Sequence, residues 1–360
     1  MATLEGGLGG VVAKHYDNLP EKGKEQRKDS RIFHMRNFNN WIKSTLINEY
    51  MEKIKSCQVD DYRCKVLDIG KQQILNLKEY SILISTSLSA CGKGGDLLKW
   101  QRCGVAHVVG VDIAATSIEQ CKERYADMRG KNRGKLFSGE FYTADCTKKR
   151  IRDLYRDPEI LFDLVSCQFA FHYCFESLPQ AECMIQNIAE NLKKGGFFVG
   201  TTPCSNDIMA RLQNCGGNSF GNSVFSVTFP QSEGEKPLQP PLFGAQYTFH
   251  LEEVVDCPEF LVHFPTFVKL AERYGLMMVG KERFQNYFQK KVKGEEQKKL
   301  LNRMNALECY PSHKLVGEEN QYDHAQEFQQ TSEGGHFGTL SKDEWEALTI
   351  YVIFAFKKIR

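Results

Sequence analysis

One glycine-rich stretch and two acidic residues stand where a nucleoside-binding site would need them. The segment CGKGGDLLKW, residues 91–100, has glycines that let the backbone turn sharply just before a helix start. Asp112 ends the next β-rich run, about 20 residues after the turn, where a carboxylate can accept both ribose hydroxyls of an adenosine. Asp145 closes the following run in TADC and is placed to bind an adenine amino group. The order of these signals predicts a pocket for an adenosine cofactor.

Each of these signals also has an ordinary structural interpretation. Glycines after a strand commonly form only a turn, and an acid that ends a strand, such as Asp112 or Asp145, often caps a helix. The occurrence of all three signals in the right order favours the cofactor interpretation, because motif order is more specific than any single motif.

The glycine-rich motif is interrupted. VLDIG, residues 66–70, and CGKGGDLLKW form one continuous motif, a strand ending near an acid and then a glycine turn, when residues 71–90 are removed. We hypothesise that 71–90 is a retained intron or gene-model error, since a Gly-Lys junction can be encoded with a splice-donor-like GU. The seam is ambiguous by one residue, because removing 70–89 puts Ala90 in place of Gly70. The alternative is a genuine surface insertion, since a flexible loop closes at modest entropic cost.

A nicotinamide dehydrogenase is the natural competitor for this pattern. It needs G-x-G-x-x-G to seat a pyrophosphate on a helix N-terminus. Here Asp96 stands at the helix start, where its charge would repel a pyrophosphate but tolerate a cationic sulfonium. The loop therefore favours a methyltransferase that uses S-adenosylmethionine.

The elements that must position these residues alternate between strand and helix patterns, which is typical of parallel strands joined by crossover helices. Late apolar runs at 277–279 and 350–356 predict an antiparallel pair at the sheet edge. We therefore expect an α/β fold of the class I, Rossmann-like methyltransferase type, with a mainly parallel seven-stranded sheet, helices on both faces and an antiparallel C-terminal edge. The five parallel strands are expected at 65–70, 107–113, 137–143, 162–169 and 196–201.

The sequence predicts where two helices in this region end. Ala181, Ile185, Ile188, Ala189 and Leu192 repeat at helical spacing behind Pro179, and the pattern predicts a stop at 193–196, where two lysines precede two glycines. A second helix is expected at 267–274, before Gly275.

Composition limits the class of protein. At 360 residues with 41% hydrophobic content, the chain suits a single large domain, with an N-terminal arm at about 1–30 and excursions at about 205–260 and 289–342. A net charge of +2 argues against an extended surface that binds nucleic acid electrostatically and independently of its sequence. The 13 cysteines lack metal-ligand spacing, so we expect free thiols and no metal. No leader or 18-residue apolar run occurs, which predicts an intracellular protein without a membrane partner.

Several longer motifs point to one family. RIFHMRNFNNWIK at 31–43, SCQFAFHY at 166–173 and DCPEF at 256–260, together with the rejoined glycine motif, resemble the mRNA cap guanine-N7 methyltransferases of eukaryotic nuclei. The resemblance covers roughly residues 11–358. Cys204, after Thr201-Thr202-Pro203, departs from it mildly, because asparagine is common there.

The resemblance implies methyl transfer from S-adenosylmethionine to N7 of the cap guanosine in GpppN. N7 has an in-plane lone pair and no proton, so no acid or base residue is expected; His172, Glu259 and Tyr351 would position the guanine. The cofactor contacts it implies are Lys43, Gly70, Asp112, Asp145, Gln168 and Tyr173. The cap contacts it implies are Asn39, Asn40, Lys93, Leu98, Arg124, His172, Glu259 and Tyr351.

Composition alone gives plainer interpretations of these residues. Asn39 and Lys43 would lie on a solvated helix face, opposite the apolar stripe of residues 38, 41 and 42. His172 would be a satisfied core histidine, Glu259 a turn residue, and the basic stretch at 122–135 a solvated helix face.

The resemblance also implies a nuclear location and capped pre-mRNA, RNA polymerase II and, in a vertebrate, a small activating subunit as partners. Two alternatives stay open at this point. The chain could be a class I methyltransferase for another small molecule or a protein, or a cap-binding protein inactivated by residues 71–90.

Overall fold

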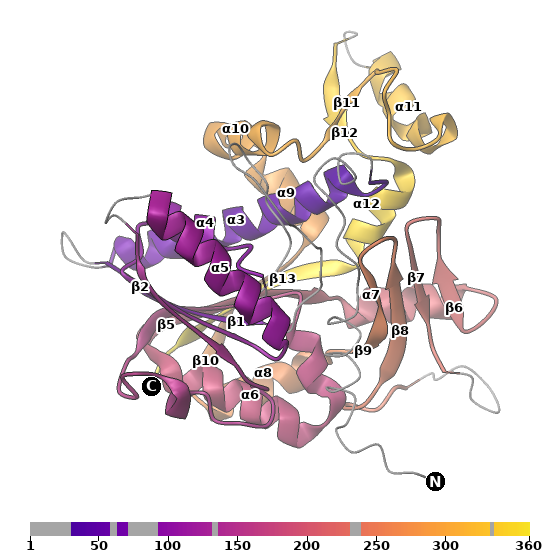
Figure 1. Cartoon of the computed structure of the whole chain (residues 1–360). Helices are drawn as coiled ribbons and strands as arrows, with labels where there is room; N and C mark the ends of the chain where they lie inside the picture. The colour runs from indigo at the N-terminus through magenta and orange to yellow at the C-terminus, as the bar shows by residue number, and fades with distance from the viewer. Residues whose placement is uncertain (1–29, 58–62, 71–92, 132–135, 231–238, 332–334) are drawn as a thin grey trace.

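We describe a computed structural model of the chain (Figure 1). The structure describes residues 30–57, 63–70, 93–131, 136–230, 239–331 and 335–360. The expected N-terminal arm, apart from Ser30, and the interruption at 71–90 both lie outside the described residues.

The central element is a seven-stranded sheet in the order β10-β13-β5-β4-β1-β2-β3. The strands β1 to β5 are parallel, whereas β13 runs antiparallel to both β5 and β10. This confirms the expected class I methyltransferase fold with its antiparallel C-terminal edge. The strands are β1 (Lys65–Gly70), β2 (His107–Asp112), β3 (Ser138–Thr143), β4 (Phe162–Gln168), β5 (Leu192–Pro203), β10 (Leu276–Arg283) and β13 (Tyr351–Lys358).

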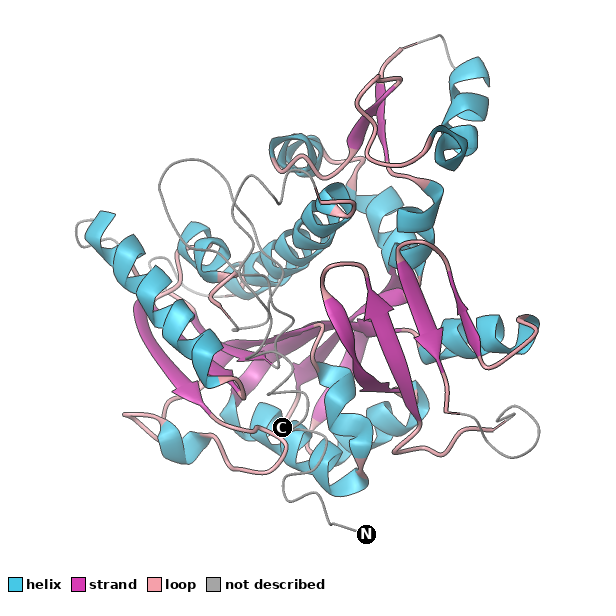
Figure 2. Ribbon diagram, turned by 45° about the vertical axis from the view of Figure 1, so that its right-hand side comes forward, coloured by secondary structure: helices cyan, strands magenta, loops and turns pink. Residues whose placement is uncertain are grey.

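Helices cover both faces of this sheet (Figure 2). Successive strand residues enter opposite cores, as Val66 and Leu67 do on β1 and Leu164 and Val165 do on β4. Burial on both faces explains why these strands read as nearly continuous apolar runs. One core contains residues of α3 (Phe33–Lys55), α4 (Leu97–Arg102) and α5 (Ala115–Lys131), and the other contains residues of α6 (Leu178–Asn191) and α8 (Phe264–Arg273).

The expected end of α6 is wrong. The helix stops at Asn191, and Leu192 is already extended, with ψ of 136°. Leu192 pairs with Phe162 of β4, so the lysines and glycines at 193–196 lie inside β5 and do not cap the helix. Pairing with a buried neighbouring strand outweighs the local capping pattern here. The second expected helix is α8, which begins three residues earlier than predicted, with Pro265 in its first turn.

The stretch at 205–260 forms a separate antiparallel sheet beside the central one (Figure 1). Its strands are β6 (Ser219–Gly221), β7 (Phe225–Thr228), β8 (Gln246–Leu251) and β9 (Val255–Phe260), and α7 (Ser205–Asn214) precedes them.

The stretch at 289–342 forms a third, smaller unit that Figure 1 shows at the top of the molecule. A capping box between Ser341 and Glu344 fixes the start of the helix that follows this unit. Its elements are α10 (Glu295–Arg303), β11 (Glu308–Tyr310), α11 (Asp323–Thr331) and β12 (Phe337–Thr339), between α9 (Phe284–Lys291) and α12 (Lys342–Thr349).

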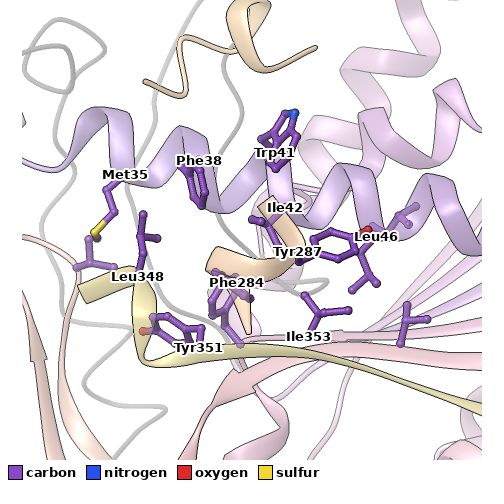
Figure 3. Packing of buried hydrophobic residues seen from close by; sticks show 14 of the residues in the cluster. Met35, Phe38, Trp41, Ile42, Leu46, Phe284, Tyr287, Leu348, Tyr351 and Ile353 are labelled. Carbon is purple, nitrogen blue, oxygen red and sulfur yellow. The ribbon is translucent and has the colours of Figure 1, made fainter. Parts of the chain in front are cut away.

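Helix α3 packs across the edge of the main core (Figure 3). Phe38 and Trp41 lie against Phe288 of α9, with ring centroids 5.1 and 5.6 Å apart, and the Trp41 indole N–H donates to the Gln297 carbonyl at 2.8 Å. The opposite face is buried as well, since Lys43 has no exposed surface. The solvated interpretation of this face is therefore wrong, and a buried polar helix face needs partners.

No helix in the part of the chain that the structure describes is long and apolar enough to cross a membrane. The described cysteines are all free, as the sequence predicts.

Candidate active site at the carboxyl edge of the sheet

Three of the expected cofactor residues end adjacent strands of the sheet. Gly70 of β1 is paired with Asp112 of β2, and Asp68 of β1 is paired with Ser166 of β4. Gln168, two residues after Ser166, therefore lies level with Gly70. The crevice between β1 and β4, where the strand order reverses, is the usual ligand site of open α/β sheets.

A small cavity opens at this edge. Its volume is only about 20 Å³, and its lining is mainly apolar, which suits the face of an aromatic ring. It brings together Gly70, Asp145 and Tyr173, which come from three separate segments. The other lining residues are Ile69, Ile113, Ala144, Cys146, Thr147, Ala170, Cys174 and Met184.

The two acids that follow β2 and β3 also shape their own turns. Asp112 is fully buried, and its Oδ1 accepts the backbone N–H of Ala114 at 2.9 Å. Asp145 Oδ1 accepts both the N–H and the hydroxyl of Thr147, at 3.0 and 2.6 Å. Each acid therefore stabilises a turn through the residue two positions on, and neither caps a helix, because α5 begins at Ala115 and the described helix after Asp145 begins only at Arg152.

Gln168 ends β4 at a strained turn. Its side chain is 1% exposed, and its Nε2 donates to Ser166 at 3.2 Å, while within the described residues its Oε1 has no hydrogen-bond partner. Phe169 follows with φ of 57°, which costs a residue other than glycine about 1 kcal/mol or more. Thr201 holds the turn by accepting the Phe169 N–H on its Oγ1 at 2.9 Å. Stored strain beside an unsatisfied buried amide makes this turn a candidate for a functional element.

The glycine-rich turn resumes in the structure at Lys93, which is buried. Gly94 has φ of +75°, and a Cβ there would lie 2.7 Å from Cδ1 of Leu97, so only glycine fits. The same added carbon would lie 3.1 Å from Cys121, so the turn packs against α5.

Two of the expected cap residues lie on the neighbouring helices α4 and α5. Leu98 in the first turn of α4 is 37% exposed, and Arg124 on α5 is half-buried, with a pKa that burial lowers. Neither residue belongs to the two buried polar clusters described next, which surround Asp96 and Glu259.

Asp96 binds two lysines in the interior. Lys43 Nζ lies 3.0 Å and Lys99 Nζ 2.6 Å from its Oδ1, and neither Lys43 nor Asp96 has exposed side-chain surface. Burial lowers the pKa of Lys43 to about 8, and Asp96 opposes that shift. Because the two lysines match its charge, Asp96 does not present a bare carboxylate to a ligand. The repulsion of a pyrophosphate that the sequence predicts for Asp96 is therefore not expected in the folded chain.

A second cluster lies on the turn after β4 and on β9. Glu259 Oε1 lies 3.3 Å from His172 Nε2, and both side chains are 2% exposed. Glu259 is paired with Tyr247 across the β8–β9 ladder, and the Tyr247 hydroxyl donates to Glu259 Oε2 at 2.8 Å. The approach of His172 to Glu259 lacks the alignment of a hydrogen bond, so both ring nitrogens of His172 are without a hydrogen-bond partner in the described chain.

Aromatic side chains wall this cluster. The ring of His172 lies 4.3 Å from that of Tyr173, and the ring of Tyr351 lies 5.1 Å from that of Phe169. Burial first, and then the charge of Glu259, raises the pKa of Tyr351. Tyr351 therefore stays a neutral phenol beside Glu259.

Three expected site residues carry buried polar atoms without hydrogen-bond partners among the described residues. These atoms are both ring nitrogens of His172, Oε1 of Gln168 and Oδ1 of Asn39. Atoms of the same kind occur elsewhere in the described chain, for example on His107, Asn191 and Glu344, so they do not by themselves locate a ligand. Because buried polar groups are almost always hydrogen-bonded, the ring nitrogens of His172 differ from those of a satisfied core histidine.

Three residues that contact the site were not predicted from the sequence: Tyr247, Lys99 and Asp68. Asp68 is 3% exposed, accepts the Trp100 indole N–H at 3.2 Å, and has a pKa that burial and then the charge of Asp96 raise. The signal for Lys99 is its position three residues after Asp96 on one helix turn. Tyr247 gives no such signal, since it is in phase with the core residues Phe249 and Leu251 along β8.

A larger cavity, of about 320 Å³, lies between α3, α4 and α10, and none of the expected site residues lines it. Its lining includes Ser44, Asn48, Lys99 and Arg303. The expected site residues lie instead around the strained turn at the sheet edge. In the described ranges no group of three metal-ligating side chains occurs.

Comparison with known proteins gives one consistent result. The family model described as the mRNA (guanine-N(7))-methyltransferase domain matches residues 2–81 and 71–359. The two matched segments meet within the interruption found at 71–90.

Curated relatives from different kingdoms agree with the family model. The chain is 45% identical to a Drosophila melanogaster protein named mRNA cap guanine-N(7) methyltransferase, over 97% of this chain and 77% of that protein. A Caenorhabditis elegans protein of the same name is 39% identical over 96% of this chain and 86% of its own length. The mRNA cap guanine-N(7) methyltransferase 1 of Oryza sativa subsp. japonica is 36% identical, with coverage of 96% and 80%.

Proposed function

This chain belongs to the mRNA (guanine-N(7))-methyltransferase family and methylates the cap guanine, and we propose that it does so at the carboxyl edge of the central sheet. The observation that carries the proposal is the buried pair of His172 and Glu259, whose imidazole nitrogens lack hydrogen-bond partners in the described structure. His172 follows β4, close to the strained end of that strand at Gln168, and Glu259 lies on β9.

The residues at the edge fit S-adenosylmethionine, which supplies an electrophilic methyl group when it is bound. The apolar cavity beside Asp145 suits the adenine, and the Asp112 carboxylate suits the ribose hydroxyls. Gln168 offers an unsatisfied buried oxygen to a donor, and Lys43 offers a buried cation to a carboxylate.

The second cluster fits the Watson–Crick edge of guanine. A purine N1–H and a 2-amino group are both donors, and the Glu259 carboxylate is an acceptor whose Oε2 Tyr247 already holds in place. The ring nitrogens of His172 have no hydrogen-bond partner among the described residues, so they would supply a further donor or acceptor at the same edge. Tyr351 and Phe169 would form an apolar wall for the ring.

No residue needs to act as acid or base, because N7 carries no proton and has its lone pair in the ring plane. The residues of this chain therefore act by positioning, which holds the two reacting atoms about 3–3.5 Å apart and in line. Lys93 and Arg124 would favour the cap phosphates from the turn and from α5.

Methyl transfer from labelled S-adenosylmethionine tests this proposal. We expect label in GpppA, released as 7-methylguanosine after digestion, and none in a GpppA whose guanosine already carries a methyl group at N7. Equal labelling of both dinucleotides would contradict the proposed target atom.

The same assay separates the remaining alternatives. Transfer to a small molecule or a protein without transfer to GpppG would favour another substrate. Binding of GpppG without transfer of label would favour an inactivated cap-binding protein. Family membership and the burial of His172 beside Glu259 support the active enzyme.

The proposed substrate implies a place of action and partners. Capped pre-mRNA is formed in the nucleus, so we propose nuclear action, with RNA polymerase II and a small activating subunit as candidate partners. Co-purification with the transcribing polymerase would test this.

A further inference from the structure

The turn after β3 carries Asp145, and Asn187 of α6 binds the backbone of this turn at three points. The Asn187 side chain is buried, with the residue 1% exposed. Its Nδ2 donates to the carbonyls of Cys146 and Lys149, both at 2.8 Å, and its Oδ1 accepts the Ile151 N–H at 3.0 Å. One buried amide therefore satisfies three backbone groups of the segment 146–151.

These three bonds replace those that a helix or strand would supply. The turn lies between β3 and the short helix η1 (Arg152–Leu154). The Asp145 carbonyl closes its first part by accepting the N–H groups of Lys148 and Lys149 at 3.1 and 3.0 Å. Buried backbone groups without partners are costly, so a segment outside regular structure needs side chains to bind it. Asn187 is such a side chain for the rest of the turn.

The position of this turn determines the position of Asp145. Asp145, Cys146 and Thr147 line the small cavity at the sheet edge. Asp145 Oδ1 is itself tied to the turn, because it accepts the N–H and the hydroxyl of Thr147. Met184, one turn before Asn187 on α6, lines the same cavity. Because residues three apart share a helix face, α6 binds the turn with Asn187 and lines the cavity beside it with Met184.

We propose that Asn187 is a positioning residue for the cofactor, because it holds the turn that directs Asp145 to the adenine amino group. This inference rests on the proposed function, which places the adenine beside Asp145. Asn187 does not line the cavity itself, so its effect on the cofactor passes through Asp145.

Calorimetry on the full chain with two ligands tests this role. S-adenosylhomocysteine carries the adenine amino group, and S-inosylhomocysteine carries an oxygen in its place, which cannot donate to a carboxylate. We expect the unaltered chain to bind S-adenosylhomocysteine at least about tenfold more tightly, and Asp145→Ala to lose most of this preference. The preference is a ratio of two affinities of one variant, so a general loss of stability lowers both affinities and leaves the ratio unchanged.

Two substitutions of Asn187 should lower the preference. Asn187→Asp has nearly the same shape and still accepts the Ile151 N–H, but its carboxylate cannot donate to the two carbonyls. We expect it to reduce the preference to below about threefold. Asn187→Ala removes all three bonds and should act in the same direction, so the test does not depend on the folding of one variant. In a chain with Asp145→Ala neither substitution should change the preference further, because residues that act through one contact are not additive.

Asn191→Asp is the matched control. Asn191 is fully buried one turn later on α6, and its Nδ2 donates at 2.7 Å to the carbonyl of Asn187 within the helix. It should leave the preference unchanged, although it also replaces a buried asparagine by an acid.

The outcomes separate this inference from the proposed function. If the Asn187 variants keep the full preference, or if Asn191→Asp lowers it as much as Asn187→Asp does, Asn187 only supports the fold. The inference is then overturned and the proposed function stands. If Asp145→Ala keeps the full preference, the adenine lies elsewhere, and the proposed cofactor site fails together with the role of Asn187.

Discussion

The carboxylate of Glu259 on β9 lies 3.3 Å from the imidazole of His172, which follows β4 in the other sheet. Glu259 comes from the excursion at 205–260 and His172 from the segment after β4, and burial leaves both with little contact to water. The pair therefore exists only because the antiparallel sheet lies beside the carboxyl edge of the central one. This relationship makes Glu259 the first residue to test.

Replacing Glu259 by Gln should remove the acceptor for the two guanine donors. We expect kcat/KM for GpppG to fall by about 100-fold, the scale of losing a charged hydrogen-bond partner, with S-adenosylhomocysteine binding changed by less than about threefold. Steady-state methyl transfer and calorimetry would measure the two effects.

Glu308→Gln is the matched control for Glu259→Gln. Glu308 is also a buried glutamate that accepts from a buried tyrosine, Tyr322, at 2.6 Å, but it lies in the small unit at 289–342. Its substitution should lower stability without selective loss of cap methylation. If Glu259→Gln loses cofactor and cap binding equally, Glu259 is structural.

Asp112→Asn should weaken the cofactor. The neutral amide can still accept the Ala114 N–H, so the turn survives, but the charge-assisted bonds to the ribose are lost. We expect affinity for S-adenosylhomocysteine to fall by about 10- to 100-fold. Asp163→Asn at the opposite end of the sheet should leave that affinity unchanged, although Asp163 is equally buried. A similar loss in both variants would mean that Asp112 acts only through stability.

Cofactor affinity should fall as the pH rises through about 8. Burial lowers the pKa of Lys43 to about 8, so its ammonium is present at pH 7 and is lost above that value. A neutral Lys43 no longer attracts the cofactor carboxylate, so S-adenosylhomocysteine should dissociate more readily at pH 9. Lys43→Met should bind more weakly at pH 7 and lose this part of the pH dependence. An unchanged pH profile in the variant would exclude Lys43 as the titrating group.

Much of the fold follows from the sequence. The alternation of apolar runs predicts β1 to β4 to within a residue or two. β1, β2 and β4 are buried along nearly their whole length, so their apolar runs stand out in the sequence. The end of α6 was mispredicted, since lysine and glycine at 193–196 are good helix terminators in isolation. The pairing of Leu192 with Phe162 depends on a partner strand that local patterns do not contain.

The site could be predicted only where it is local. Gly94, Asp112 and Asp145 follow strands, so their position in the motif indicates their role. The partnership of Tyr247 and Glu259 is set by the β8–β9 register, and that of Lys43 and Asp96 by the packing of α3 on the glycine turn. Composition favours exposure for such residues, which is why the plain interpretation of α3 failed.

Residues 71–90 lie outside the described structure, and that they are a retained intron or gene-model error is a hypothesis. β1 ends at Gly70 and the buried turn resumes at Lys93, so the interruption falls in the motif that must hold the cofactor. We expect a chain that lacks 71–90 to bind S-adenosylhomocysteine at least about tenfold more tightly than the full chain, because the fused motif loses less loop entropy. Equal affinities, together with mature transcripts that encode ILNLKEYSIL, would establish a genuine insertion.

The central claim is that one cleft seats the cofactor and the cap guanine in line. A crystal structure of the complex with S-adenosylhomocysteine and GpppG tests it most directly. We predict the adenosine between Asp112 and Asp145, the guanine edge on His172 and Glu259, and N7 facing the sulfur atom. A guanine bound elsewhere, or one with N7 turned away from the sulfur, would contradict the account.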